Sequence, residues 1–273
     1  MNFEQASPAQ DSGAESTELA NEVLENIKQL KTKGIALFPG FLSASQVKEL
    51  QQESSDLWQN QSKLEPNNLR VGLRENKRGH ICLDRLDPVS DISALFAKLN
   101  ENRILLGIIE AALGEPATAM KDKLIYKQPG VSGFGLHRDE PYFCASGARG
   151  EEMISASFAL DEANETSGCM FFYPEARKQN LKPPEDEQRD ISTRAITAFK
   201  QEIFTMQTGD LLLFDGLIPH GSNFNLSDHP RRTYTVTFVP ARYKHARKKY
   251  YQNRLLEQEE ERKYKIESDF FFK

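Results

Sequence analysis

Three residues of this chain have the types and the spacing to bind one metal ion. His137 and Asp139 are two residues apart, and residues i and i+2 of a strand point to the same face, so both side chains can reach one ion. His220 lies far downstream and can supply a third ligand. Two histidines and one carboxylate on one face of an octahedral metal leave three positions open, as in non-haem Fe(II) oxygenases. The pattern therefore indicates oxygen-activating chemistry.

An arginine follows the last of these residues. Arg231 directly precedes residues 232–239, whose polar/apolar alternation is typical of a barrel strand with one face to the interior. A guanidinium binds a carboxylate through two parallel hydrogen bonds, which a lysine cannot reproduce. We therefore predict that Arg231 anchors a dicarboxylate co-substrate whose other end chelates the metal. Arg232 would take this role if Arg231 pointed outward, because adjacent strand residues face opposite sides.

The composition is that of an ordinary globular protein. Of the 273 residues, 38% are hydrophobic and 27% are charged, which is enough for one large domain with a buried core. The net charge of -5 gives no reason to expect nucleic acid as a partner. No apolar run approaches the roughly 20 residues that cross a bilayer, and residues 1–27 lack a signal-peptide pattern. We expect a cytoplasmic protein with a small-molecule substrate and no membrane partner.

The elements that must position these residues begin with helices. Residues 1–18 lack periodic apolar positions and are expected to form a flexible tail, and residues 19–273 are expected to form a single catalytic domain. The expected elements are a helix over 19–31, a strand over 34–38, a helix starting at the capping box of Ser43 and Gln46, and a helix over 92–113 ending at Gly114.

From residue 122 onward the pattern becomes β-rich. Helices followed by short strands indicate an α+β fold whose mainly β core, residues 122–240, is a jelly roll or small barrel. The polar stretch 174–199 is too long for a tight hairpin and is either a surface insertion or a substrate lid. Residues 242–265 are expected to form an exposed charged helix. The expected core strands lie at 124–126, 153–160, 211–214 and 234–239.

Several motifs, taken in order, resemble the phytanoyl-CoA dioxygenase family of Fe(II)- and 2-oxoglutarate-dependent oxygenases. They are residues 127–130, 137–139, 159–169, 208–210 and 220–222, and Arg231, with a looser likeness from residue 34 that includes 38–42. The resemblance implies a double-stranded β-helix, a cupin-like jelly roll with N-terminal and flanking helices. The residues that it assigns are His137, Asp139 and His220 as catalytic Fe(II) ligands, and Arg231, Ser222 and Lys127 as contacts of 2-oxoglutarate.

The resemblance also implies a reaction. A dioxygenase of this kind uses O2 and 2-oxoglutarate to hydroxylate an unactivated C–H bond of a small molecule and releases succinate and CO2, with ascorbate as an optional stimulant. Related halogenases carry a small residue in place of the ligand carboxylate. Asp139 therefore favours hydroxylation, or a related oxidation such as desaturation, over halogenation.

Residues close in sequence to the metal ligands are expected to contact the substrate. Ser157 stands where many relatives have a bulky aromatic, which predicts unusual room and a bulky or polar substrate; Lys123 stands where an apolar residue is common. The candidates are Tyr142, Phe143, Ser155 and Ser157, and Arg70, Arg74 and Arg85 from the segment before the barrel.

Two further classes of protein have to be weighed against the hydroxylase. One is a non-catalytic β-barrel that binds a metal and a small acid, as a sensor or binding module; the complete ligand set and Arg231 favour the enzyme. The other is a zinc hydrolase with the same ligands, but no obvious general base lies beside them in the sequence.

Overall fold

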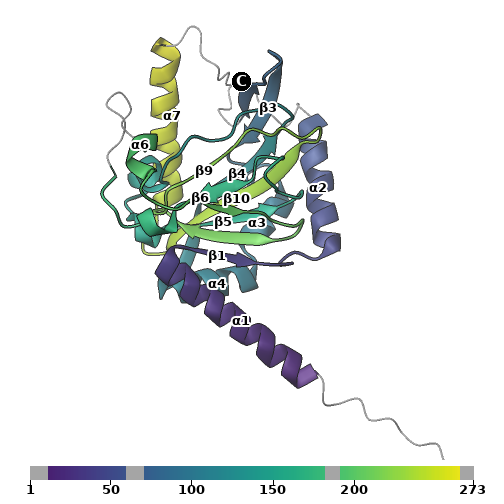
Figure 1. Cartoon of the computed structure of the whole chain (residues 1–273), viewed down its shortest axis with the longest axis vertical. Helices are drawn as coiled ribbons and strands as arrows, with labels where there is room; N and C mark the ends of the chain where they lie inside the picture. The colour runs from purple at the N-terminus through teal and green to yellow at the C-terminus, as the bar shows by residue number, and fades with distance from the viewer. Residues whose placement is uncertain (1–11, 60–70, 182–190, 265–273) are drawn as a thin grey trace, which may run out of the picture.

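Two antiparallel sheets facing each other form the centre of the molecule (Figure 1). The computed structural model of the chain describes residues 12–59, 71–181 and 191–264. Its strands are β1 (Ile35–Phe38), β2 (Val71–Glu75), β3 (Ile81–Leu86), β4 (Ala117–Lys127), β5 (Ile154–Ala159), β6 (Met170–Phe172), β7 (Glu202–Phe204), β8 (Leu211–Asp215), β9 (His220–Ser222) and β10 (Arg231–Pro240). The larger sheet has the order β1-β8-β5-β10-β4-β3-β2, and the smaller has the order β7-β6-β9. This arrangement confirms the expected jelly roll.

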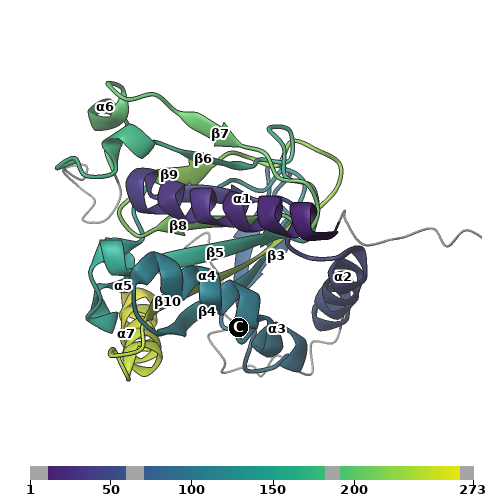
Figure 2. The ribbon, with the colours of Figure 1, turned by 90° about the horizontal axis from the view of Figure 1, so that it is seen from below.

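Helices cover one side and both ends of the larger sheet. Figure 2 shows helices on the side of the larger sheet opposite β6 and β7. The helices are α1 (Ser12–Lys33), α2 (Ala44–Gln59), α3 (Ala94–Asn100), α4 (Arg103–Leu113), α5 (Glu140–Phe143), α6 (Thr193–Ile196) and α7 (Ala246–Tyr264), with short 3-10 turns at Cys144–Ser146, Gly150–Glu152 and Pro174–Ala176.

Alternation along the central strands gives the larger sheet two different faces. On β10, Tyr234 and Phe238 belong to the main apolar core, whereas Thr233, Thr235 and Thr237 face a cavity beneath the smaller sheet. The sequence pattern of 232–239 predicted this division. The apolar face of the larger sheet therefore stabilises the fold, and the polar face lines the cavity.

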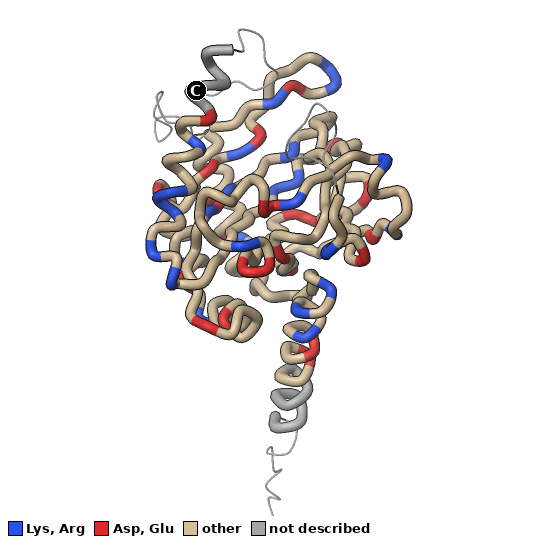
Figure 3. The backbone as a smooth tube through the Cα atoms, turned by 90° about the vertical axis from the view of Figure 1, so that its left-hand side faces the viewer, with Lys and Arg blue, Asp and Glu red and all other residues tan. Residues whose placement is uncertain are grey.

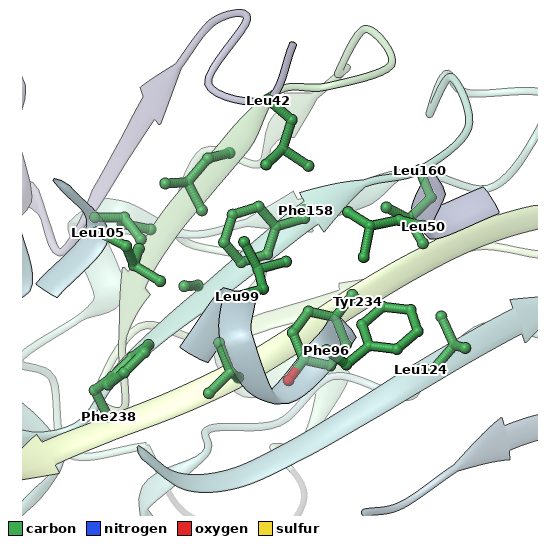
Figure 4. Close-up of a cluster of buried hydrophobic side chains, with 14 of the residues drawn as sticks. Leu42, Leu50, Phe96, Leu99, Leu105, Leu124, Phe158, Leu160, Tyr234 and Phe238 are labelled. Carbon is green, nitrogen blue, oxygen red and sulfur yellow. The ribbon is translucent and has the colours of Figure 1, made fainter. Parts of the chain in front are cut away.

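The apolar face packs against α3 and α4 (Figure 4). The rings of Phe96 and Tyr234 lie with their centroids 4.7 Å apart, and Phe158 stacks on the other side of Tyr234 at 6.1 Å. The buried Tyr234 hydroxyl donates a hydrogen bond to Asn100 Oδ1 at 2.6 Å, so this polar group is satisfied inside the core. These contacts hold the central strands, and hence the opposite face, in a fixed register.

The helical segments differ from the sequence expectation at two places. Helix α1 begins at Ser12, so the expected tail is wrong over residues 12–18, whose Ala and Glu residues favour a helix without an apolar period; residues 1–11 lie outside the described chain. The expected helix 92–113 is two helices, because the Asn102 side chain caps α4 by accepting hydrogen bonds from the amides of Ile104 and Leu105.

Other boundaries agree with the sequence. The capping box that starts α2 is present: the Ser43 amide donates to Gln46 Oε1 at 2.9 Å and the Gln46 amide donates to Ser43 Oγ at 3.3 Å. Gly114 ends α4 with a positive φ of 80°, a conformation that favours glycine.

The β core is larger than residues 122–240. Strand β4 begins at Ala117, and β1, β2 and β3 from the N-terminal half complete the larger sheet. The charged run at 121–123 concealed the first half of β4, because alternating charges are unusual in a strand unless one face is polar. Two of those charges point into the cavity, as described below.

Helix α7 is not a freely exposed element, unlike the expected charged helix 242–265. Ala246 and Tyr250 are buried in a small apolar cluster, and Arg247 Nη1 donates to the buried Asp122 Oδ2 at 2.8 Å. In the view of Figure 3, basic and acidic residues are interspersed over the molecule. Within the described part of the chain, none of the helices combines the length and apolar character needed to cross a bilayer.

Candidate active site

The three predicted metal ligands lie together. Gly133 brings their segment against β9 so closely that a Cβ there would lie 1.6 Å from the Ser222 carbonyl oxygen. His137 and His220 then form an antiparallel bridge with two backbone hydrogen bonds of 2.9 Å. The Nε2 atoms of His137 and His220 lie 3.9 and 4.0 Å from Oδ1 of Asp139.

The local backbone differs from the expected strand. Asp139 has φ -71° and ψ -32° and starts α5, and its carbonyl accepts hydrogen bonds from the amides of Tyr142 and Phe143. Pro141 near the start of α5 favours this turn into a helix. The two ligand side chains therefore converge through a strand-to-helix turn, and the premise that both residues lie on one strand is wrong.

Each imidazole is oriented by a backbone carbonyl. His137 Nδ1 lies 2.7 Å from the Gly135 carbonyl oxygen, and His220 Nδ1 lies 3.0 Å from that of Ile218. Donation from Nδ1 to a carbonyl leaves the Nε2 lone pair free for a metal, which is a common arrangement around metal-binding histidines. The ring of His220 also packs against the rings of Phe172 and Phe214, at centroid distances of 5.5 and 4.8 Å.

The charges of the ligands suit a cation. Burial, and then the neighbouring His137, lower the pKa of His220 to about 3, so that its imidazole is neutral at physiological pH. Burial alone would raise the pKa of Asp139, but the two imidazoles, Lys121 and Lys123 hold it below the usual value. A carboxylate and the neutral imidazole of His220 are thus available to a cation.

The second oxygen of Asp139 has its own partner. Ser155 Oγ donates to Asp139 Oδ2 at 2.9 Å and also lies 2.9 Å from Thr237 Oγ1. These hydroxyls fix the carboxylate so that Oδ1 faces the two imidazoles.

The geometry of the donor set fits an octahedral divalent metal. Neighbouring ligand atoms at ~2.1 Å from such an ion are roughly 3 Å apart, so separations of 3.9 and 4.0 Å leave room for the ion with small side-chain movements. Two imidazoles and a carboxylate are also the donor types that suit Fe(II). The described residues can therefore hold iron on three adjacent positions.

Arg231 lies in the same cavity with unused hydrogen-bonding capacity. It is 4% exposed, its Nη1 donates to Thr233 Oγ1 at 3.2 Å, and its buried Nε has no hydrogen-bond partner among the described residues. Burial lowers the pKa of Arg231 to about 10, so the guanidinium stays charged at neutral pH. Arg232 points to the opposite side and forms a bidentate pair with Asp161 at 2.7 and 2.8 Å. Of the two arginines, only Arg231 faces the metal ligands.

The two other predicted co-substrate residues contact each other. Lys127 Nζ donates to Ser222 Oγ at 2.9 Å and to the carbonyl oxygens of Gly168 and Asn223, both at 2.8 Å. Ser222 lines the cavity, whereas the buried Lys127 stands behind it. Lys127 therefore positions Ser222 and the loop around Gly168 instead of pointing at the cavity itself.

The cavity between the sheets has a volume of about 580 Å3 including its open mouth. Of the predicted substrate residues, Phe143, Ser155 and Ser157 line it, and Ser157 is fully buried there. Tyr142 instead packs edge-on against the ring of His137 at 5.5 Å.

The predicted arginines lie elsewhere. Arg85 pairs with Asp84 at 3.0 Å and Arg74 lies over the Phe134 ring at 4.9 Å, and neither is among the residues that line the cavity. Arg70 is outside the described residues.

Sequence reasoning missed several residues of the cavity. Lys121 and three threonines of β10 belong to its wall, and Lys123 was noted only as a departure. The signal that could have found them is the alternation of Lys121, Lys123 and Ile125 with apolar and acidic residues along β4. The remaining histidines, His80, His229 and His245, are exposed.

The insertion 174–199 is joined to the metal-ligand segment at both of its described ends. Arg138 Nη2 donates to the carbonyl oxygens of Ala176 and Gln179, both at 2.8 Å, and the Ile191 amide donates to the Leu136 carbonyl at 2.9 Å. Residues 182–190 lie outside the described chain, and a lid function stays a prediction.

Comparison with known proteins finds a matching family and named relatives. The family model for phytanoyl-CoA dioxygenase (PhyH) matches residues 30–233. A methylphosphonate hydroxylase from Gimesia maris is 34% identical over 141 residues, which cover 52% of each chain. A 2-aminoethylphosphonate dioxygenase from an uncultured bacterium, HF130_AEPn_1, is 30% identical over 138 residues, which cover 50% of each chain. The match thus spans about half the length of these relatives.

Solved structures share the fold. EctD from S. alaskensis, crystallised with 2-oxoglutarate and 5-hydroxyectoine, superimposes with a TM-score of 0.70 at 18% identity, covering 80% of this chain and 76% of the other. At this level of identity the likeness concerns the fold, and the residues described above carry the functional inference.

Proposed function

Because the chain belongs to the phytanoyl-CoA dioxygenase (PhyH) family, we propose that it is an Fe(II)- and 2-oxoglutarate-dependent dioxygenase that hydroxylates a C–H bond of a small molecule. The observation that carries this proposal is the common cavity. His137, Asp139 and His220 face it together with Arg231, whose buried Nε is without a partner among the described atoms. A metal site beside a buried guanidinium with an unsatisfied donor suits a co-substrate that is both chelating and acidic.

Each group has a defined task in this proposal. His137, Asp139 and His220 hold Fe(II), and Ser155 keeps the Asp139 carboxylate in place. Bound Fe(II), 2-oxoglutarate and O2 supply the oxidation, with succinate and CO2 as co-products. Arg231 binds the distal carboxylate of 2-oxoglutarate.

The surrounding side chains prepare the cavity for that co-substrate. Ser222 offers its hydroxyl to the same carboxylate, and Lys127 fixes Ser222 from behind. Phe214 and Met170, on facing sheets, limit the access of water.

The substrate is a small molecule that fits the cavity beside the iron. Two relatives, at 34% and 30% identity, are named for methylphosphonate and 2-aminoethylphosphonate, so organophosphonates are the first compounds to test. Ser157, where many relatives have a bulky aromatic, leaves room on β5 for the substrate.

The proposal is tested by binding and by turnover. Under anaerobic conditions, Fe(II) followed by 2-oxoglutarate should bind with 1:1 stoichiometry and give the weak visible charge-transfer absorption of the ternary complex. On admission of air and a substrate panel that includes the two phosphonates, succinate should form in an O2-dependent manner. Asp139→Ala should lose metal binding, because one of three ligands and the only ligand charge are removed.

A matched control separates loss of the site from loss of the fold. Asp228→Ala changes an exposed carboxylate that also lies beside a histidine, His229, and it should bind Fe(II) and 2-oxoglutarate like the native chain. Native protein that binds both but forms no succinate with any compound would instead be a metal- and acid-binding module.

A further inference from the structure

Two lysines of β4 stand in the cavity beside the metal site, and the proposed chemistry does not use them. We propose that Lys123, supported by Lys121, binds the phosphorus oxyanion of the primary substrate, a small organophosphonate or phosphate monoester. This inference rests on the proposed function for the places of iron and 2-oxoglutarate. It adds the anionic group that the substrate must carry and the residues that recognise this group.

Lys123 has no direct ion-pair partner among the described residues, and Asp139 acts on its charge only at longer range. Its ammonium makes no hydrogen bond within the described chain and lies over the ring of Phe134, 4.7 Å from the ring centroid. Lys121 is different, since its Nζ lies 3.9 Å from Asp87 Oδ2 and 4.5 Å from the Phe143 ring centroid. A cation that is buried without a partner is costly, and such groups are commonly completed by a ligand.

The net charge of the cavity loaded with Fe(II) and 2-oxoglutarate also favours an anionic substrate. Lys121, Lys123 and Arg231 line the cavity with a single carboxylate, Asp139. Fe(II) and a 2-oxoglutarate dianion together add no net charge, so the cavity has an excess of two positive charges whenever both lysines are protonated. Asp87 neutralises one of them at Lys121, and the other remains at Lys123. A substrate with one or two negative charges removes this excess.

The lysines and Arg231 occupy different parts of the cavity. In the register of β10 with β4, Arg231 lies opposite Lys127, whereas Thr235 lies opposite Lys123 and Thr237 opposite Lys121. At about 3.3 Å per residue, Arg231 and Thr235 are roughly 13 Å apart along the strand. Lys123 therefore belongs to a second anion site, separate from the carboxylate anchor.

Contacts across β5 place this second site near the iron. Ser155 lies opposite Thr237 on β5 and donates to Asp139. Lys121, Thr237 and Ser155, which lie side by side on three strands, therefore mark the end of the sheet that carries the metal ligands. The bond to be oxidised must lie at this end.

The donor types favour a tetrahedral oxyanion. A guanidinium fork matches a planar carboxylate, whereas an ammonium is a point charge with donors in several directions and binds phosphate-like groups well. Around Lys123 the hydroxyls of Thr235 and Ser157 also face the cavity, 3.3 Å from each other. Ammonium and hydroxyl donors from three strands can thus share three oxygens on phosphorus.

Binding to the holoenzyme tests the proposal. Protein loaded anaerobically with Fe(II) and 2-oxoglutarate is titrated calorimetrically with methylphosphonate, methyl phosphate and acetate. We expect the two phosphorus compounds to bind and acetate to bind at least about tenfold more weakly. In Lys123→Met the Kd of methylphosphonate should rise about 10- to 100-fold, as for loss of one charged hydrogen bond, while the Kd of 2-oxoglutarate changes less than about threefold.

Matched variants make the result specific. Lys123→Arg should recover most of the affinity because it keeps the charge, and Lys48→Met, an exposed lysine on α2, should behave like the native chain. Equal losses for 2-oxoglutarate and methylphosphonate in Lys123→Met would assign Lys123 to the co-substrate and overturn the inference. So would native protein that binds neither phosphorus compound, or that prefers acetate.

Other outcomes separate this inference from the proposed function. Lys123-dependent binding of methylphosphonate without succinate formation from any compound supports the anion site and refutes the dioxygenase. Succinate formation with a neutral substrate, unchanged in Lys123→Met, supports the dioxygenase and refutes the anion site.

Discussion

Replacement of Arg231 by methionine tests the co-substrate anchor most directly. Arg231 is 4% exposed and its Nε is unsatisfied within the described structure, so the cost of burying the guanidinium is already present in the ligand-free protein. A bidentate pair with the distal carboxylate of 2-oxoglutarate gives two charge-assisted hydrogen bonds of about 1.5–3 kcal/mol each. The lower end of that range, about 3 kcal/mol in all, weakens binding roughly 100-fold.

Removing one partner of a buried ion pair usually destabilises a protein, but Arg231→Met should not destabilise this one. Methionine fills much of the arginine volume and removes a charge without a counter-ion, so the free energy of unfolding of ligand-free Arg231→Met should stay within about 1 kcal/mol of the native value or exceed it. The stabilisation that 2-oxoglutarate adds should be lost. Calorimetric titration of Mn(II)-loaded protein and urea unfolding measure the two quantities.

The next residue supplies the control. Arg232 donates to both oxygens of Asp161 on the opposite face of β10. Arg232→Met should lower the free energy of unfolding by about 1–3 kcal/mol and leave the Kd of 2-oxoglutarate within about twofold. An unchanged Kd in Arg231→Met, or an equal loss in Arg232→Met, would refute the assignment of Arg231.

Three other predictions follow from contacts described above. Burial lowers the pKa of Lys123 from 10.5 to about 7, so between pH 7 and 10 the unfolded chain holds the proton that the folded chain has lost, and the contribution of Lys123 to the free energy of unfolding rises with pH. In Lys123→Met, urea unfolding at pH 7 and 9 should therefore show a free energy of unfolding that rises less steeply with pH, by about 0.5–1 kcal/mol per pH unit. Ser155→Ala, which frees the second oxygen of Asp139, should weaken Mn(II) binding about 10- to 100-fold in calorimetry; unchanged affinity would contradict this support role. Arg247→Met, which unpairs α7 from Asp122, should lower the free energy of unfolding by about 1–3 kcal/mol without changing Mn(II) affinity.

The metal ligands could be predicted from sequence because their chemistry is local. A His-x-Asp triplet, a later histidine and an arginine before an alternating strand are readable as a pattern, and the fold brings all four to one cavity. The exact backbone was not readable: Asp139 lies at the start of a helix because Pro141 and the hydrogen bond from the Glu140 amide to Gly216 draw the chain away from β9.

The wall of the cavity was harder to predict, because a charged side chain is stable in a strand only if it faces polar groups or solvent in the folded protein. Lys121 and Lys123 kept the first half of β4 out of the expected strands, although they point to a polar cavity that forms only when β5 and β10 lie alongside. In the same way, the break between α3 and α4 depends on one capping residue, Asn102, inside an otherwise continuous apolar pattern.

The position of β1 at the edge of the larger sheet affects the order in which the chain folds. Ile35 pairs with Phe214, so this edge closes only after most of the chain has been synthesised. Contacts between such distant residues form slowly, because the intervening loop must close first. Until β8 has been made, the apolar strand β1 lacks its partner, and its backbone groups can pair with other chains. Once β8 has joined the sheet, β1 covers the outer edge of β8 and so limits aggregation through that edge.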